Sequence, residues 1–139
     1  MEMFTIEKSL ANTSTEKEHI LLVEDDILNK ELITIYLRNI CIIDHASDGL
    51  KAIELSKQKS YSLILMDINL GAGINGIETA KRIRTTNYYK NIPVIAITAF
   101  AMSGDRDKLL AEGFDNYLAK PFEKKELVEL VQNVLCVKC

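Results

Sequence analysis

Residues 61–76 read YSLILMDINLGAGING and place one carboxylate, Asp67, directly after the apolar run 63–66. A short, nearly continuous apolar run is typical of a strand that is buried on both faces of a parallel sheet. Burying a carboxylate is costly unless another group pairs with it. The position of Asp67 at the end of such a run therefore indicates a special role for this residue.

Four further apolar runs divide the chain. They are HILLVE (19–24), CII (41–43), PVIAIT (93–98) and the weaker NYLA (116–119). Segments with the apolar period of a helix cover 28–40, 49–59, 76–84, 102–112 and 124–135. Strand and helix thus alternate along the chain with short connections. This pattern predicts an α/β fold, a doubly wound parallel sheet between two layers of helices.

Length and composition limit the classes of function. The chain has 139 residues, of which 47% are hydrophobic, enough for one packed domain. With 17 basic and 20 acidic residues its formal net charge is -3, so it lacks the positive field that binds nucleic acid or anionic membranes. No signal peptide or membrane-spanning apolar run is visible. We expect a soluble, cytoplasmic protein with neither a direct nucleic-acid partner nor membrane insertion.

The two ends of the chain carry little functional signal. Residues 1–18 are polar and lack apolar periodicity, so we expect a tail or linker there and the folded domain over 19–139. The chain has three cysteines, Cys41, Cys136 and Cys139, and no export signal, which favours reduced thiols. The last two have C-x-x-C spacing, but no second ligand pair supports a zinc site.

Polar side chains follow the apolar runs where each predicted strand ends. They are Glu24, Asp25, Asp26, Asp67, Thr98 and Lys120. Ligands of open α/β sheets bind outside the carboxyl ends of the strands, so we expect these groups to converge there. Three carboxylates in one place must take up protons or hold a cation. Mg²⁺ fits, because it accepts one or two carboxylates and leaves room for phosphate oxygens.

Single residues in this set also have simpler interpretations. Asp26 fits the N-cap of the next helix, Thr98 a β-branched strand end, and Lys120 a solvated turn residue. Their joint occurrence at strand ends is what favours a functional site. Pro121 restricts the backbone of Lys120 and is compatible with the cis peptide bond that tight turns use.

Four ordered motifs carry a family resemblance: LLVEDD (21–26), LILMD (63–67), AITA (96–99) and AKPF (119–122). Together they resemble the receiver domain of bacterial two-component response regulators, from about residue 19 to the last helix. The resemblance implies a flavodoxin-like (βα)5 three-layer sandwich with strand order 2-1-3-4-5. That order places the strands ending at Glu24, Asp67 and Thr98 side by side.

The resemblance also implies a phosphoacceptor and a metal site. Asp67 matches the residue that accepts the phosphoryl group, and Glu24 and Asp25 match the acidic pair. These carboxylates would hold Mg²⁺, together with the backbone carbonyl of Asn69. A positioned carboxylate can accept a phosphoryl group in line if the charge of that group is neutralised.

A switch is implied by three further residues. Thr98 and Lys120 match the positions that bind the phosphoryl group, and Tyr117 matches an aromatic residue that turns inward on activation. Three carboxylates, one Mg²⁺ and Lys120 sum to zero charge, and phosphorylation leaves roughly -1. Movement of Thr98 toward this charge would let Tyr117 swing in and alter the face formed by the last two helices and the last strand.

We therefore expect a signalling phosphoacceptor that takes its phosphoryl group from the phosphohistidine of a sensor histidine kinase or phosphotransfer protein. It would assist only its own phosphotransfer and dephosphorylation, and would act on a downstream protein partner. A stand-alone regulator and a receiver from a hybrid histidine kinase both stay open, as does a dimer formed on phosphorylation. Alternatives are a receiver-like interaction module without phosphorylation and a Mg²⁺-dependent aspartate-nucleophile phosphohydrolase. The phosphohydrolases resemble D-x-D-x-T at the nucleophile, whereas residues 67–71 read DINLG.

Two positions depart from the family pattern or extend it. Receiver domains usually carry a proline about four residues after the acceptor, whereas the loop here has no proline and is one residue longer. Glycines at 71, 73 and 76 give this loop backbone freedom, which fits a flexible turn as well as a partner-specific feature. Two residues beyond Thr98 lies Phe100. We hypothesise that Phe100, with Asn69 opposite, shields the phosphoaspartate from water and slows hydrolysis. Packing in the core is the alternative role of Phe100.

Overall fold

The structure is a computed structural model that describes residues 17–71, 73–99 and 105–138. Its centre is a parallel sheet of five strands in the order β2-β1-β3-β4-β5. The strands are β1 (Glu18–Val23), β2 (Cys41–Ala46), β3 (Leu63–Asp67), β4 (Val94–Thr98) and β5 (Asn116–Ala119). The predicted α/β fold and strand order are confirmed.

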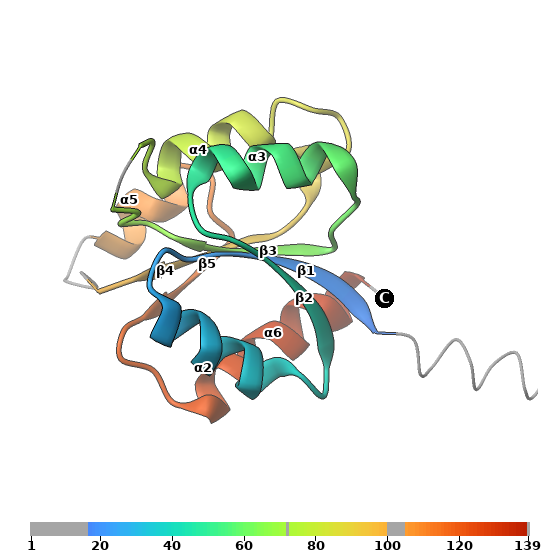
Figure 1. The fold of residues 1–139 in the computed structure, drawn as a ribbon, viewed down its shortest axis with the longest axis vertical. Coiled ribbons are helices and arrows are strands. Elements are labelled where there is room, and N and C mark those ends of the chain that lie inside the picture. Colours follow the sequence, from blue (N-terminus) through green and yellow to red (C-terminus); the bar gives the residue numbers. More distant parts are fainter. Residues whose placement is uncertain (1–16, 72, 100–104, 139) are drawn as a thin grey trace, which may run out of the picture.

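Helices cover both faces of the sheet. They are α2 (Ile27–Leu37), α3 (Gly49–Gln58), α4 (Gly76–Ile83), α5 (Asp105–Ala111) and α6 (Lys124–Lys138), with a short 3-10 helix η1 (Tyr89–Asn91) before β4. In Figure 1, α3, α4 and α5 lie on one face and α2 and α6 on the other. This is the three-layer sandwich that the sequence predicts.

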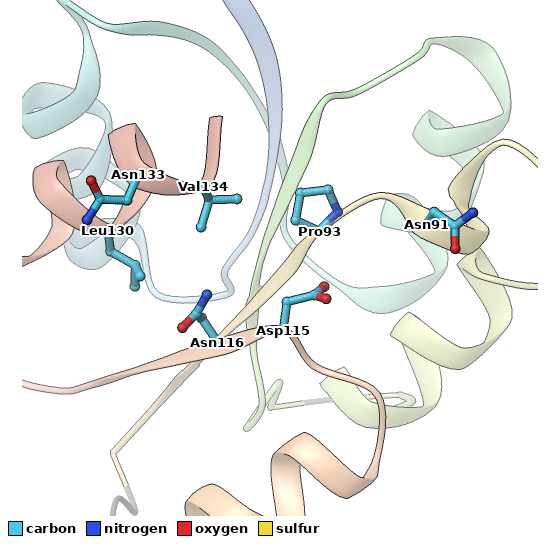
Figure 2. Close-up of a pocket in the computed structure, with 7 residues that line it drawn as sticks. All are labelled: Asn91, Pro93, Asp115, Asn116, Leu130, Asn133 and Val134. Carbon is cyan, nitrogen blue, oxygen red and sulfur yellow. The ribbon is translucent and has the colours of Figure 1, made fainter. Parts of the chain in front are cut away.

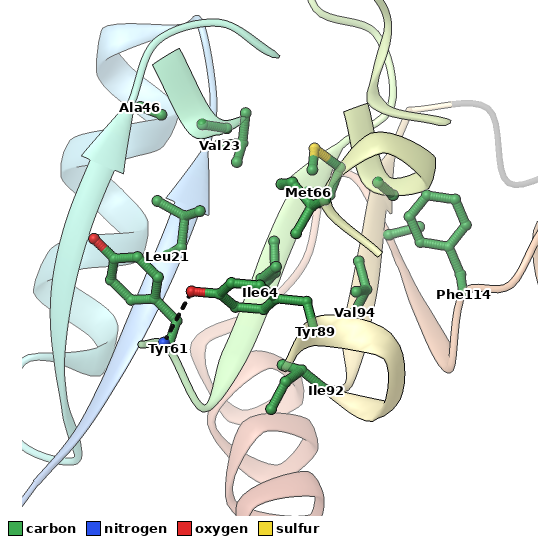
Figure 3. Packing of buried hydrophobic residues seen from close by; sticks show 14 of the residues in the cluster. Leu21, Val23, Ala46, Tyr61, Ile64, Met66, Tyr89, Ile92, Val94 and Phe114 are labelled. Carbon is green, nitrogen blue, oxygen red and sulfur yellow. Dashed lines mark hydrogen bonds between the residues drawn. The ribbon is translucent and has the colours of Figure 1, made fainter. Parts of the chain in front are cut away.

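Each face of the sheet has its own hydrophobic core. Successive side chains of a strand point to opposite faces of the sheet. Ile64 and Met66 therefore belong to the first core, under α3 to α5, and Leu63 and Leu65 to the second core, under α2 and α6. Figure 3 shows part of the first core, in which Tyr89, the first residue of η1, packs with Tyr61 and with apolar side chains of the strands. All four residues 63–66 are fully buried, which explains why the run has no polar position.

Three predicted boundaries need correction. Helix α6 runs to Lys138, three residues beyond its predicted end at Leu135. Helix α2 ends at Leu37, not at Ile40, and a turn follows in which the Ile40 N–H donates to the Leu37 carbonyl. Ile40 still packs against the second core, and its apolar side chain therefore extends the helical pattern of the sequence beyond the end of the helix. Strand β2 runs to Ala46, beyond the CII run, because its pairing with β1 continues through polar residues. Strand β2 lies at the edge of the sheet and pairs with β1 only, and an edge strand tolerates polar residues.

Side chains cap the helices that begin near the carboxyl ends of the strands. The Asp26 carboxylate accepts the Leu28 N–H at 2.8 Å and also the Asn29 N–H, so Asp26 is the N-cap of α2. Asp48 caps α3 and Asn75 caps α4 in the same way. The peptide bond between Lys120 and Pro121, just after β5, is cis, as the sequence suggested.

Candidate functional site

A polar cleft of about 240 Å³ lies at the carboxyl ends of the strands. Its lining residues come from the end of β3, the start of α2 and the segments that follow β1, β3, β4 and β5: Glu24, Asp25, Asp26, Asn29, Asp67, Asn69, Ala99 and Lys120. Of the polar groups predicted to converge, only Thr98 does not line this cleft. The sheet order brings the others together because β1 is a direct neighbour of β3, and β5 is separated from β3 only by β4.

Asp67 is fixed by two hydrogen-bond donors. It is the last residue of β3 and only 3% exposed. The Asn69 N–H donates to Oδ1 at 3.1 Å, and the Lys120 ammonium group donates to Oδ2 at 3.4 Å. Helix α4 begins directly behind it, since a Cβ on Gly76 would lie 2.3 Å from the Asp67 carbonyl oxygen. The carboxylate is thus held in one orientation at the edge of the sheet.

Glu24 combines deep burial with a second negative charge nearby. It is 1% exposed, and its Oε1 accepts a hydrogen bond from Lys120 at 3.1 Å. Oε2 is also buried, and no group in the described part of the chain donates to it. Burial, followed by the closeness of Asp67, raises the pKa of Glu24 to about 8, against the opposing effect of Lys120.

Lys120 bridges the two buried carboxylates. Burial lowers the pKa of its ammonium group, but the contacts with Glu24 and Asp67 outweigh this effect and hold the pKa above its ordinary value. Its backbone N–H donates to the Thr98 carbonyl at 2.8 Å, which continues the β4–β5 pairing by one residue. The ammonium group is therefore charged and anchored from the sheet itself.

The donor set fits a hard divalent cation. Ligand oxygens of Glu24, Asp25 and Asp67 all lie within 4.8 Å of one another. One ammonium group cannot balance three ionised carboxylates, so the cluster has to take up a proton, as the raised pKa of Glu24 indicates, or hold a cation. The buried Oε2 of Glu24 lacks a donor among the residues that the structure describes. Carboxylate and carbonyl oxygens are the ligands that Mg²⁺ takes in proteins, usually with several waters retained.

The residues predicted to form the switch lie beside the cleft. Thr98 ends β4, is 3% exposed, and lines a separate cavity of about 120 Å³ together with residues of α4 and α5. Tyr117 is half-buried on β5, and the Arg106 guanidinium lies 6.0 Å from its ring centroid. Asn69 lines both cavities and connects them. Phe100 lies outside the described residues.

Sequence reasoning missed several contacts of the site. Asn29 and Ala99 line the cleft, His45 Nε2 lies 2.7 Å from the Glu24 carbonyl oxygen, and the Gly71 N–H donates to Asp25. Asn29 gives no signal because a polar residue on a helix is ordinary. His45 belongs to the part of β2 that the CII run did not predict. The missing proline drew attention to Gly71, but not to its partner.

A larger cavity, of about 460 Å³, lies at the opposite edge of the sheet, between the starts of β4 and β5 and the end of α6 (Figure 2). Its lining residues are Asn91, Pro93, Asp115, Asn116, Leu130, Asn133 and Val134. Asp115 is already engaged, because its Oδ2 accepts the Val94 N–H and an Arg84 N–H, both at 2.8 Å. This cavity lies away from Glu24, Asp25 and Asp67 and takes no part in the site described above.

The sheet order 2-1-3-4-5 with an acidic cleft at its carboxyl edge defines a receiver-type domain of two-component signalling. Residues 20–132 match the family model of the response regulator receiver domain, and the chain belongs to this family. Receiver domains are signalling domains of phosphorelays. No helix in the described part of the chain is long and apolar enough to cross a membrane.

Relatives include both multidomain kinases and short regulators. The chain is 38% identical over 127 residues to hybrid signal transduction histidine kinase I of Dictyostelium discoideum, matching 86% of this chain and 7% of that kinase. It is 36% identical to the histidine-protein kinase BarA of Escherichia coli, over 81% of this chain and 12% of BarA. The regulator DivK of Brucella anthropi is 33% identical, over 84% of this chain and 94% of DivK.

Solved structures agree on the fold. The receiver domain of the sensor histidine kinase PA1611 of Pseudomonas aeruginosa is 34% identical, with a TM-score of 0.79 over 87% of this chain and 99% of that one. That structure is described as having a magnesium ion coordinated in its active site cleft. The chemotaxis protein CheY4 of Vibrio cholerae, 24% identical with a TM-score of 0.80 over 86% of this chain and 99% of that chain, shares the fold.

Proposed function

We propose that this receiver domain takes a phosphoryl group from a phosphohistidine onto Asp67. The observation that carries the proposal is the state of the Asp67 carboxylate, which is buried at the sheet edge and fixed by the Asn69 N–H and the Lys120 ammonium group. A weak nucleophile becomes effective when its orientation is fixed and the charge of the incoming group is neutralised. The donor is a sensor histidine kinase or a phosphotransfer protein.

The cation site belongs to the same proposal. Glu24, Asp25 and Asp67 would hold Mg²⁺ with their carboxylates, and Asn69 with its backbone carbonyl. When bound, the ion neutralises negative charge on the phosphoryl oxygens. The magnesium described in the PA1611 receiver domain supports this assignment.

Group transfer needs no further catalytic acid in this chain. A bond forms between a carboxylate oxygen of Asp67 and phosphorus, while the bond between phosphorus and the donor's imidazole nitrogen breaks and that nitrogen keeps the electron pair. Lys120 lies within reach of Asp67 and remains to balance the charge of the phosphorylated carboxylate. Transfer in the reverse sense and slow hydrolysis return the domain to its starting state.

We assign the switch to Thr98 and Tyr117. The added negative charge on Asp67 attracts a new hydrogen-bond donor, and Thr98 lies at the end of the neighbouring strand β4. Movement of Thr98 changes the cavity that it shares with α5, and Tyr117 on β5 follows. The altered face, formed by α5, β5 and α6, would contact the downstream protein partner.

An exposed apolar face next to the cleft fits the docking of the phosphohistidine donor. Ile27 and Leu28 directly follow Asp26 at the cleft and are 71% and 79% exposed, and Ile35 continues the face on α2. A protein that brings a phosphohistidine to Asp67 has to cover this rim. Apolar contacts there add binding energy close to the reacting groups.

Mass spectrometry of the intact protein tests the proposal. Wild type and Asp67→Asn are incubated with acetyl phosphate, a small phosphoryl donor, with and without Mg²⁺. We expect one phosphoryl adduct on the wild type, dependent on Mg²⁺ and removed by hydroxylamine, and none on the variant. An adduct of equal yield on Asp67→Asn would refute the assignment of the acceptor.

A further inference from the structure

Asp25 is the least constrained member of the acidic cluster. Glu24 and Asp67 are almost fully buried and both contact Lys120, whereas Asp25 is exposed in the loop after β1. An exposed aspartate side chain loses rotamer freedom when it binds a cation. A group that fixes Asp25 in advance would therefore strengthen cation binding.

Such a group lies in the loop after β3. The backbone N–H of Gly71 donates to Oδ2 of Asp25 at 2.9 Å and joins two loops that are 46 residues apart in the sequence. A hydrogen bond from a backbone amide to a carboxylate is charge-assisted and stronger than one between neutral groups. The bond leaves the second oxygen of Asp25 available to a cation.

The amide itself is held in place on both sides. Leu70, the residue before it, is only 7% exposed and packs into the first core. On the far side of the loop, the Gly76 N–H donates to the Ile68 carbonyl at 3.1 Å and closes the loop onto the end of β3. The Gly71 N–H thus has a fixed position relative to the sheet.

The residue type at position 71 agrees with this role. Gly71 does not have a positive φ, so its φ does not require glycine. A Cβ there would lie 2.9 Å from Asp25 Oδ2, so a side chain would crowd the carboxylate. A proline, which receiver domains usually carry near this position, has no N–H to donate. Glycine supplies the donor and leaves the approach open.

We infer that the Gly71 N–H is a positioning group for the cation site and holds the Asp25 carboxylate at the acidic cluster before Mg²⁺ binds. The inference rests on the proposed function, because it takes Asp25 as a cation ligand. It assigns a role to the glycine-containing loop, which the sequence marked only as a departure from the family pattern.

Two variants separate the N–H from the crowding effect of a Cβ. Gly71→Ala and Gly71→Pro both add a Cβ next to Asp25, but only the proline variant lacks the N–H. We expect the Kd for Mg²⁺, measured by titration calorimetry, to be on the order of tenfold higher for Gly71→Pro than for Gly71→Ala. Equal Kd values for the two variants would overturn the inference. If the wild type still bound Mg²⁺ in that case, the cation site of the proposed function would be unaffected.

A second measurement needs no change at position 71. Without Mg²⁺, we expect the amide proton signal of Gly71 in a nitrogen-proton correlation spectrum to lie further downfield in the wild type than in the Asp25→Ala variant. Should Gly71→Pro fail to fold, this experiment decides, and an unmoved signal overturns the inference. If the wild type binds no Mg²⁺ at all, the cation site of the proposed function fails and the inference fails with it.

Discussion

Glu24 is the residue at which burial and charge conflict most directly. It shares the Lys120 ammonium group with Asp67, is 1% exposed, and has a pKa raised to about 8. Near neutral pH and without a cation, Glu24 therefore keeps a proton that an exposed glutamate would have lost. At the proposed cation site, a bound cation would replace that proton and so link cation binding to the stability of the fold.

This linkage predicts a pH dependence of stability. Between pH 4.5 and about 8 the unfolded chain has released the Glu24 proton while the folded chain retains it, so the free energy of unfolding falls as the pH rises through this window. We expect Glu24→Gln, which cannot ionise, to lack this decline. Without Mg²⁺, the difference in free energy of unfolding between the wild type and Glu24→Gln, measured by urea denaturation, should change by about 1–3 kcal/mol from pH 5 to pH 8. A constant difference would contradict the assigned cause.

At the level of single residues, much of the site could be predicted from the sequence. Asp67, Glu24 and Lys120 directly follow apolar runs, and strand ends of a parallel sheet meet at one edge. Hydrogen bonds between loops could not be predicted, because they depend on how two irregular segments approach each other. The contact between Gly71 and Asp25 is of this kind.

Helices α3 and α4 pack closely at the first residue of α3. A Cβ on Gly49 would lie 2.2 Å from Thr79 Oγ1 and 2.6 Å from a side-chain carbon of Ile74. Helix propensity alone favours alanine over glycine by about 1 kcal/mol. Here the crowding of the neighbouring helix and loop opposes that gain.

We therefore expect Gly49→Ala to destabilise the protein, by about 1–3 kcal/mol in urea denaturation. The control is Lys51→Ala at an exposed position of the same helix, which should change stability by less than about 0.5 kcal/mol. A stabilised Gly49→Ala would show that α3 and α4 move apart easily at this contact.

The apolar face of α2 predicts a difference between protein and small-molecule donors. Leu28→Ser should slow phosphorylation by a phosphohistidine protein that phosphorylates the wild type, on the order of tenfold, since apolar contacts near the cleft would be lost. Phosphorylation by acetyl phosphate should stay unchanged. Leu50→Ser, on α3 and 61% exposed, is the matched control and should affect neither reaction. Equal slowing with both donors would place the effect in the site, not in docking.

Element boundaries were less predictable than the elements themselves. The sheet order and the two helical layers follow from the alternation of apolar runs and helical periods. The end of α2 and the length of β2 do not, because Ile40 is apolar outside its helix and Asp44 is polar inside its strand. Asp44 is accommodated at the sheet edge by a salt bridge to Lys59 and a hydrogen bond from the Tyr61 hydroxyl.

On the scale of the whole molecule, the site lies at the carboxyl ends of the strands, and we expect its two flanks to have different tasks. The loop after β1 and the end of β3 carry the carboxylates, whereas β4 and β5, next to α5, carry Thr98 and Tyr117. A charge added to Asp67 is therefore expected to affect the second flank. Helix α3 lies away from it, beside α4, as Figure 1 shows.

Hydrogen exchange measured by mass spectrometry tests this division. After phosphorylation with acetyl phosphate and Mg²⁺, we expect exchange rates to change in peptides covering α5 and β5 and to stay the same in peptides from α3. Tyr117→Ala should reduce the change in β5 without preventing phosphorylation. An equal change across the whole sheet would contradict a switch built on Thr98 and Tyr117.

Chemical mapping identifies the residue that carries the phosphoryl group, which we propose to be Asp67. The protein is phosphorylated in the presence of Mg²⁺ and reduced with borohydride, which converts an aspartyl phosphate to homoserine, and its peptides are sequenced by mass spectrometry. We expect conversion at Asp67 alone. Conversion at Asp25, or at any other carboxylate with Asp67 intact, would contradict this assignment.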